Sequence, residues 1–183
     1  MNTNIIVVDD FYSNPDSVRE YAKNLNFSIE GNYPGRRTAP ESNLKVLESV
    51  FNTFQNLIPP IIKPWDYNNL GYNTAFQLTL EQDETWIHSD ATDWACVVYL
   101  TPNAPINSGT AFYSYEGKRQ SFKKGGKTPK PWSNSWVKTD IISNVYNRAV
   151  IYNGLLYHRS DLPGFGDSVS NGRLFQTFFF DNA

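Results

Sequence analysis

Cysteine and histidine are scarce in this sequence: its 183 residues include one Cys and two His. The lone cysteine, Cys96, excludes a disulfide within the chain and suits a reducing compartment. We interpret it as a small apolar residue of a buried strand, the usual place of a free cysteine. The two imidazoles belong to His88 and His158, and both fall in the candidate metal site described below.

The sequence also lacks a surplus of charge and a long hydrophobic run. Its 16 basic and 18 acidic residues give a formal net charge of −2, which argues against a generic binder of nucleic acid or of membrane surfaces. No apolar run approaches the ~18 residues that a membrane span needs. No basic segment followed by an apolar one opens the chain, so no signal peptide is predicted. We therefore expect a soluble, cytoplasmic protein.

Aromatic residues, by contrast, are abundant, with 12 Phe, 11 Tyr and 5 Trp making up 15% of the chain. Such residues suit β-strands and the walls of a shaped pocket. The length suits one domain with one core. We expect a single domain over residues 1–183, with an N-terminal strand and helices in 1–65, a β-rich core in 73–181 and a long basic insertion loop at 116–135.

Residues 4–10 predict a short strand, and the segment after them predicts a helix. Asn14 suits the N-cap and Pro15 the first helical position, because proline has no amide hydrogen to leave unpaired there. This helix should end near Asn24. The turn residues of 31–37 then predict a loop.

A second helix should begin at Glu41 or Ser42. Apolar residues recur at helical spacing through residues 44–58, and the two prolines at 59–60 should stop the helix. We expect this apolar stripe to cover one face of a sheet. The N-terminal part would then supply two helices that support a β core.

Beyond residue 65 the sequence changes to short apolar runs separated by turns, which is typical of β-sandwiches and barrels. The predicted strands are residues 73–80, 86–90, 95–101, 109–113, 145–152 and 173–181.

Two basic segments have more than one interpretation. Arg36 and Arg37 could contact an acidic substrate, but a solvated loop or a surface salt bridge is the default for such a pair. The Lys- and Arg-rich insertion at 116–135 could steer an acidic partner toward the protein, or it could be a solvated segment. A loop of this length in a small domain is either functional or disordered.

The segment around His88 carries the clearest chemical signal. In a strand, residues i and i+2 point the same way, so His88 and Asp90 can reach one metal while Ser89 points away. With His158 they make two imidazoles and one carboxylate, the facial triad that binds iron(II) and leaves the opposite side open. Arg173 follows His158 by fifteen residues at the head of the last predicted strand. A dicarboxylic co-substrate would need such a cation.

These pieces, in this order, resemble the iron(II)- and 2-oxoglutarate-dependent oxygenases, nearest the prolyl-4-hydroxylase-like branch. The resemblance covers roughly residues 73–181. It implies a mainly β (α+β) fold with a double-stranded β-helix (jelly-roll) core and two N-terminal supporting helices. The segments that carry it are residues 88–90, 96–100, 108–113, 147–152 and 172–181.

The resemblance also implies the site. His88, Asp90 and His158 would hold Fe(II), to which 2-oxoglutarate and O2 bind as co-substrates. Arg173 would pair with the far carboxylate of 2-oxoglutarate, because a planar guanidinium makes a two-pronged, charge-assisted pair. The loop before Arg173 is longer than is usual in the branch. We prefer Arg173 to Arg159, which would point away on its strand.

Three further residues are implied as co-substrate contacts. Tyr99 matches the tyrosine of the branch that hydrogen-bonds the co-substrate. Thr177 shares the inward face of Arg173, together with Phe179, and should wall the pocket. Gln77 is a stand-in for an upstream tyrosine of the branch that has no clear match here.

The predicted function is therefore hydroxylation of a C–H bond in a small-molecule or peptidyl substrate, with a peptidyl or free amino acid favoured and with release of succinate and CO2. Two alternatives remain. The first is a non-enzymatic jelly-roll, either a module that binds carbohydrate or protein or a viral structural piece, which has no use for a ligand triad. The second is a metal hydrolase with the same ligands, which would act without 2-oxoglutarate and without oxygen.

Overall fold

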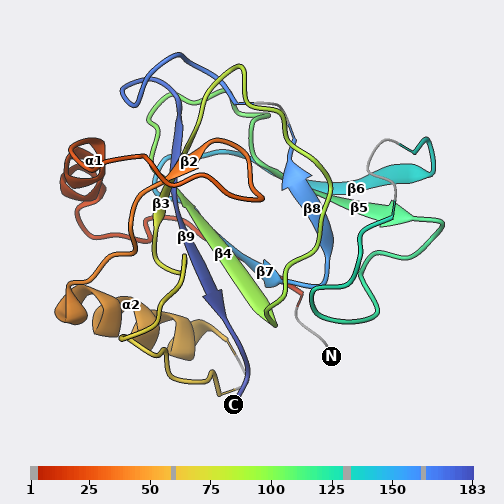
Figure 1. The fold of residues 1–183 in the computed structure, drawn as a ribbon, viewed down its shortest axis with the longest axis horizontal. Coiled ribbons are helices and arrows are strands. Elements are labelled where there is room, and N and C mark those ends of the chain that lie inside the picture. Colours follow the sequence, from red (N-terminus) through yellow and green to blue (C-terminus); the bar gives the residue numbers. More distant parts are fainter. Residues whose placement is uncertain (1–3, 59–60, 130–132, 162–163) are drawn as a thin grey trace.

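The computed structural model, which describes residues 4–58, 61–129, 133–161 and 164–183, builds the chain around two antiparallel sheets (Figure 1). The larger sheet has six strands in the order β1 (Ile5–Val8), β7 (Ala149–Asn153), β4 (Trp94–Tyr99), β9 (Arg173–Phe180), β3 (Phe76–Thr79) and β2 (Arg36–Arg37). The smaller sheet has three, in the order β6 (Trp136–Ile142), β5 (Thr110–Tyr115) and β8 (Tyr157–Ser160).

Strand β9 shows how the sequence divides the molecule into an inner and an outer side. Successive side chains of a strand point to opposite faces of its sheet. The outward residues Leu174, Phe178 and Phe180 belong to apolar clusters that also contain helix residues. The inward residues line a cavity between the sheets; they are Arg173, Phe175, Thr177 and Phe179.

Helix α2 (Leu44–Leu57) covers the outer face of the larger sheet (Figure 1). Its buried residues Leu47, Val50 and Phe54 recur at helical spacing, and they pack with outward residues of β4, β7 and β9. The helix begins later than either start predicted at residues 41–42. The side chain of Asn43 caps it by accepting the backbone N–H groups of residues 45 and 46. The prolines predicted to stop the helix lie outside the described residues.

Helix α1 (Pro15–Lys23) confirms the prediction for its segment. The side chain of Asn14 accepts the N–H of Ser17 at 3.1 Å, and Pro15 is the first helical residue. The helix buries Ala22 against Phe76 and other residues of the larger sheet. The mainly β architecture with two helices, expected from the sequence, is therefore confirmed. Neither helix that the structure describes is long and apolar enough to cross a membrane.

One expectation for the N-terminal part was wrong. The short strand expected within residues 4–10 forms as β1 and pairs with β7 in the larger sheet. Residues 36–37, expected in a loop, form β2 because their backbone pairs with β3 across forty residues of sequence. Local turn residues could not reveal such a pairing.

Two expectations for the β core also need correction. Strand β6 was not predicted, because its exposed residues alternate little in polarity and it follows the long insertion. Residues 86–90, predicted as a strand, form no regular strand; within them His88 alone forms a bridge, with His158. The segment lies alongside β8 instead of forming a strand of its own.

The packing of Phe54 gives a test of this arrangement. Its fully buried ring contacts the rings of Phe11, Trp65, Phe178 and Phe180. Phe54→Ala should therefore lower the free energy of unfolding by about 3–5 kcal/mol, measured by urea denaturation. The matched control is Phe122→Ala at a ring that is 85% exposed, which should change it by no more than about 0.5 kcal/mol. Equal effects would contradict the assignment of α2 to the core.

Candidate functional site

The two histidines, seventy residues apart in the chain, are direct backbone partners. The N–H of His88 donates to the carbonyl of His158 at 3.0 Å, and the N–H of His158 donates to the carbonyl of His88 at 2.9 Å. Their ring centroids lie 4.4 Å apart. Asp90 completes a group in which one ligand atom of each side chain lies within 4.8 Å of the others. The structure thus brings together the three residues that the sequence nominated as metal ligands.

Backbone carbonyls fix which nitrogen of each imidazole faces Asp90. His88 Nδ1 lies 3.0 Å from the carbonyl of Trp86, and His158 Nδ1 lies 2.8 Å from that of Leu156. A carbonyl can only accept, so each Nδ1 carries a proton, and in the neutral ring this leaves the lone pair on Nε2. The Nε2 atoms lie 3.8 and 3.4 Å from the carboxylate oxygens of Asp90. Metal-binding histidines typically donate the N–H of the other ring nitrogen to a backbone carbonyl or a carboxylate, as Nδ1 does here.

The electrostatics of the group also fit a cation. Asp90 Oδ2 is buried and has no hydrogen-bond partner among the described residues. Burial lowers the pKa of His158 to about 4, and the neighbouring His88 adds to this, while Asp90 opposes it. His158 is therefore neutral at pH 7, the form in which imidazole binds a metal. A buried carboxylate oxygen without a partner is costly. Beside two imidazole nitrogens, it forms a set of ligand atoms that suits a divalent cation.

The turn after β7 holds Asp90 in place. The N–H of Asp90 donates to the carbonyl of Gly154 at 2.7 Å, and the N–H of Gly154 donates to that of Asp93 at 2.9 Å. A Cβ atom at residue 154 would lie 2.3 Å from the carbonyl oxygen of Thr92. Glycine is therefore required where the two segments approach each other.

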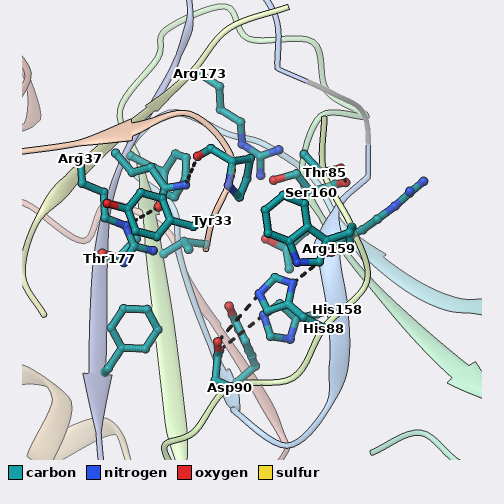
Figure 2. Close-up of a pocket in the computed structure, with 18 residues that line it drawn as sticks. Tyr33, Arg37, Thr85, His88, Asp90, His158, Arg159, Ser160, Arg173 and Thr177 are labelled. Atoms are coloured by element: carbon teal, nitrogen blue, oxygen red, sulfur yellow. Dashed lines mark hydrogen bonds and ion pairs between the residues drawn. The ribbon is translucent and has the colours of Figure 1, made fainter. Parts of the chain in front are cut away.

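Arg173 lies at the other end of a cavity of about 80 Å³ that also contains the triad (Figure 2). Its side chain is buried, with 2% of the residue exposed. Nη2 donates to the carbonyl of Gly109 at 3.3 Å, whereas Nε and Nη1 are buried without a partner among the described residues. Burial lowers the pKa of Arg173, and the neighbouring Tyr99 opposes this shift. A buried guanidinium with two unpaired donors is costly unless an anion binds it.

Of the two predicted co-substrate contacts Tyr99 and Thr177, Thr177 lines this cavity and Tyr99 does not. The Tyr99 hydroxyl is 2.6 Å from Oγ1 of Thr110, and Tyr99 is not among the described residues that line the cavity, whereas Thr110 is. Thr110, which sequence reasoning missed, stands between Tyr99 and the cavity; its place beside the Gly109 turn was the available signal. Thr177 lines the cavity, as expected for a residue four positions after Arg173 on the same face of the strand.

Gln77 lines the cavity as well, but both ends of its amide are already paired. Its Nε2 donates to the carbonyl of Pro34, and its Oε1 accepts from Nε of Arg37, both at 2.7 Å. Gln77 thus holds Arg37 instead of presenting a free group to a co-substrate. The expectation of a solvated arginine pair was right for Arg36, which is exposed and pairs with Glu30, and wrong for Arg37, which is buried.

Arg159 also lines the cavity, but its side chain extends away from the triad, as its position next to His158 on a strand predicted (Figure 2). Its Nε donates to the hydroxyl of Tyr113 at 3.1 Å. The basic insertion, in contrast, reaches the site. Lys124 forms ion pairs with Asp93 and Asp181, both at 2.8 Å, so the segment is fastened beside the turn that carries Asp90.

A broad outer cleft of about 750 Å³ adjoins the inner cavity and shares several residues with it, including His88, Asp90 and Arg37. Residues 29–33 and residues 125–128 of the insertion form part of its walls. Trp86, Tyr72 and Phe179 add aromatic surface. The open side of the triad therefore faces a space large enough for an organic molecule. Arg173 lines the inner cavity but not this outer cleft.

Comparisons with known proteins show the fold. Residues 1–130 match a family described as a family of unknown function (DUF6445). No curated protein matches the sequence significantly. Among solved structures, a prolyl hydroxylase from Trichoplax adhaerens, in complex with a hypoxia inducible factor peptide fragment, has 12% identity and a TM-score of 0.59 over 97% of this chain and 83% of that one.

Two bacterial structures are similar to the same extent. HygX from Streptomyces hygroscopicus, with nickel and 2-oxoglutarate bound, has 10% identity and a TM-score of 0.61 over 97% of this chain and 82% of its own. A prolyl-4-hydroxylase from Pseudomonas putida has 11% identity and a TM-score of 0.53 over 98% of this chain and 93% of its own. The predicted double-stranded β-helix is confirmed, and at these identities the likeness concerns the fold.

The burial of His158 predicts how the metal-free protein responds to acid. Because its pKa falls from 6.5 to about 4 on folding, the neutral ring stabilises the fold above pH 6.5. That contribution, on the order of 3 kcal/mol, should be lost as the pH falls from 6.5 toward 4, where the unfolded chain takes up a proton first. Urea denaturation in a chelator at several pH values measures it.

In His158→Gln the same pH interval should bring a smaller loss of stability. His88→Gln, at an imidazole that is 36% exposed, is the control and should keep most of the loss that His158 causes, since burial is the largest cause of the shift and His88 a smaller one. An unchanged pH profile in His158→Gln would show that this ring is not buried in its neutral form.

Proposed function

The chain belongs to the DUF6445 family of unknown function, and we propose that it is an iron(II)- and 2-oxoglutarate-dependent oxygenase that hydroxylates a C–H bond of a peptidyl or free amino acid. One observation carries the proposal. A single inner cavity has the His88, Asp90 and His158 group at one end and the unpaired, buried guanidinium of Arg173 at the other.

The two ends of the cavity together favour this function over its rivals. A carbohydrate- or protein-binding jelly-roll, or a structural one, gains nothing from three convergent ligand atoms. A metal hydrolase would use the triad, but it has no need of a buried cation at the far end of the cavity. A dicarboxylate that binds the metal through one end and Arg173 through the other uses both features. This is the binding requirement of 2-oxoglutarate.

Each residue has a defined part in such an enzyme. The lone pairs of His88 and His158 and the carboxylate of Asp90 would hold the ion on one side and leave the other side open. Arg173 would bind the far carboxylate and so fix the orientation of the co-substrate. When bound, iron(II), 2-oxoglutarate and O2 supply oxidation of the substrate C–H bond with release of succinate and CO2. The apolar wall of Val97, Phe175 and Phe179 limits the access of water.

The outer cleft is the place for the substrate, because it opens on the side of the triad away from Arg173. The fold accepts ligands of several kinds: the Trichoplax enzyme was solved with a peptide fragment, and HygX with hygromycin B. The prolyl-4-hydroxylase-like branch and an amino-acid substrate therefore rest on the sequence motifs and on the chemistry of the cleft itself.

The metal assignment predicts the behaviour of two variants. His88→Ala and Asp90→Ala should each lose tight binding of Fe(II) or Mn(II), since each removes one of three ligands, and should lose metal-dependent formation of succinate. Calorimetric titration with Mn(II) under anaerobic conditions measures the first, and chromatography of succinate the second. Ser89→Ala, between the two ligands, is the control and should still bind the metal. Wild-type affinity in either ligand variant would reject the triad.

The co-substrate assignment predicts a second effect. Arg173→Met keeps most of the apolar stem and removes the charge-assisted pair, which is worth roughly 1.5–3 kcal/mol. The concentration of 2-oxoglutarate needed for half-maximal binding should rise about ten- to hundredfold, while Mn(II) still binds. The matched control is Arg159→Met, at a second arginine that lines the cavity but whose Nε donates to the hydroxyl of Tyr113. If Arg159→Met weakens 2-oxoglutarate binding as much as Arg173→Met does, the assignment of Arg173 is wrong.

A further inference from the structure

A second arginine, Arg37, faces the candidate site from strand β2 (Figure 2). It is buried, with 6% of the residue exposed, and it lines both the inner cavity and the outer cleft. Arg173, by contrast, lines the inner cavity and not the cleft. Arg37 therefore lies where a molecule in the cleft meets the open side of the triad.

The guanidinium of Arg37 is held in a fixed orientation. Its Nε donates to Oε1 of Gln77 at 2.7 Å. Its central carbon lies 3.9 Å from the centre of the Tyr33 ring, and the rings of Tyr72 and Phe179 lie at 5.4 and 5.7 Å. Gln77 is itself fixed by the carbonyl of Pro34. Since Nε is used, the terminal amino groups of a planar, oriented fork are left for a ligand.

Aromatic rings offset only part of the cost of burying this charge. No described carboxylate forms an ion pair with Arg37, and Asp90 is the one carboxylate named among the charges that act on its pKa. Burial accordingly lowers the pKa of Arg37. A buried cation without a partner charge is costly, which favours an anionic ligand at this position.

The charges of the loaded site point the same way. The dipositive ion, the negative Asp90, the positive Arg173 and the doubly negative co-substrate would balance one another. Arg37 then remains as the surplus positive charge. Lys127 adds a second one on the wall of the cleft, whose acidic residue Glu30 is already paired with Arg36. A neutral substrate would leave this charge uncompensated.

We propose that Arg37 binds a carboxylate of the organic substrate, so that the enzyme acts on a free amino acid or a similar small carboxylic acid instead of an internal stretch of polypeptide. The two-pronged geometry of a guanidinium matches a planar carboxylate. This inference rests on the proposed oxygenase function, because it takes the outer cleft as the substrate site.

Binding to the protein loaded with Mn(II) and N-oxalylglycine, the unreactive analogue of 2-oxoglutarate, tests the proposal. The analogue occupies Arg173, so that further carboxylates must bind elsewhere. The probes are the free proteinogenic amino acids and the small dicarboxylic acids, each compared with its carboxamide by calorimetry and by the fluorescence of Trp86 and the other tryptophans. At least one acid should bind about ten- to hundredfold more tightly than its amide.

Arg37→Met should abolish this preference while N-oxalylglycine still binds as in the wild type, which shows that the cavity is intact. The matched control is Arg36→Met, at the exposed neighbouring residue, which should keep the preference in full. If Arg37→Met does not fold, Arg37→Lys keeps the charge but loses the fork, and should reduce the preference instead of abolishing it.

Three results would overturn the assignment of a carboxylate site to Arg37. In the first, no acid in the set binds more tightly to the wild type than its amide. In the second, the preference survives in Arg37→Met. In the third, inorganic phosphate or O-phosphoserine binds more tightly than every carboxylate, which would assign the site to a phosphate. Amidated and free-acid forms of a short peptide separate a peptide C-terminus from a free amino acid, and tighter binding of the peptide acid would reject the small-molecule substrate.

The same measurements separate this proposal from the oxygenase function. If N-oxalylglycine does not bind in an Arg173-dependent way, the proposed function fails. The set of probes is then repeated on Arg173→Met, in which Arg37 is the buried arginine left at the cavity. An acid-over-amide preference that depends on Arg37 in that background would retain the carboxylate site without the oxygenase.

Discussion

The pair of backbone hydrogen bonds between His88 and His158 is the constraint on which the rest of the site depends. It fixes two distant segments against each other, so that both imidazoles leave the backbone at one place. The carbonyls of Trp86 and Leu156 then set the tautomers, and the turn at Gly154 presents Asp90 to both rings. The backbone thereby holds three candidate metal-ligand side chains close together, the kind of preorganisation that the proposed metal site would need.

Buried charge is the second organising feature. Asp90, Arg173 and Arg37 lie around one small cavity, and none of the three has a full set of partners among the described residues. Each such group costs stability in the free protein. The larger sheet and the aromatic cluster around Phe54 supply the apolar burial that offsets this cost. Function and stability are thus divided between the inner and outer faces of the same strands.

The sequence predicted the parts of the site that are encoded by spacing. The His-x-Asp segment, the distant second histidine and the arginine at the head of β9 could all be read from residue type and strand alternation. The position of Arg37 could not, because its burial depends on Tyr33, Tyr72 and Gln77, which only the fold brings together. The same holds for Thr110, which lies in front of the predicted Tyr99. The β-rich class followed from the apolar runs separated by turns, and the jelly-roll from the family resemblance, whereas β2 and β6 depended on long-range pairing.

The placement of residues 86–90 along β8 has a consequence for how the protein behaves in concentrated solution. The smaller sheet would end at β8 with free N–H and C=O groups, and such an edge is a template for pairing with another chain. His88 occupies those groups through its bridge with His158, and Thr85 bonds the carbonyl of Ser160. The segment that carries two of the candidate ligands therefore also shields a strand edge, so whatever loosens it also exposes a surface prone to intermolecular β-pairing.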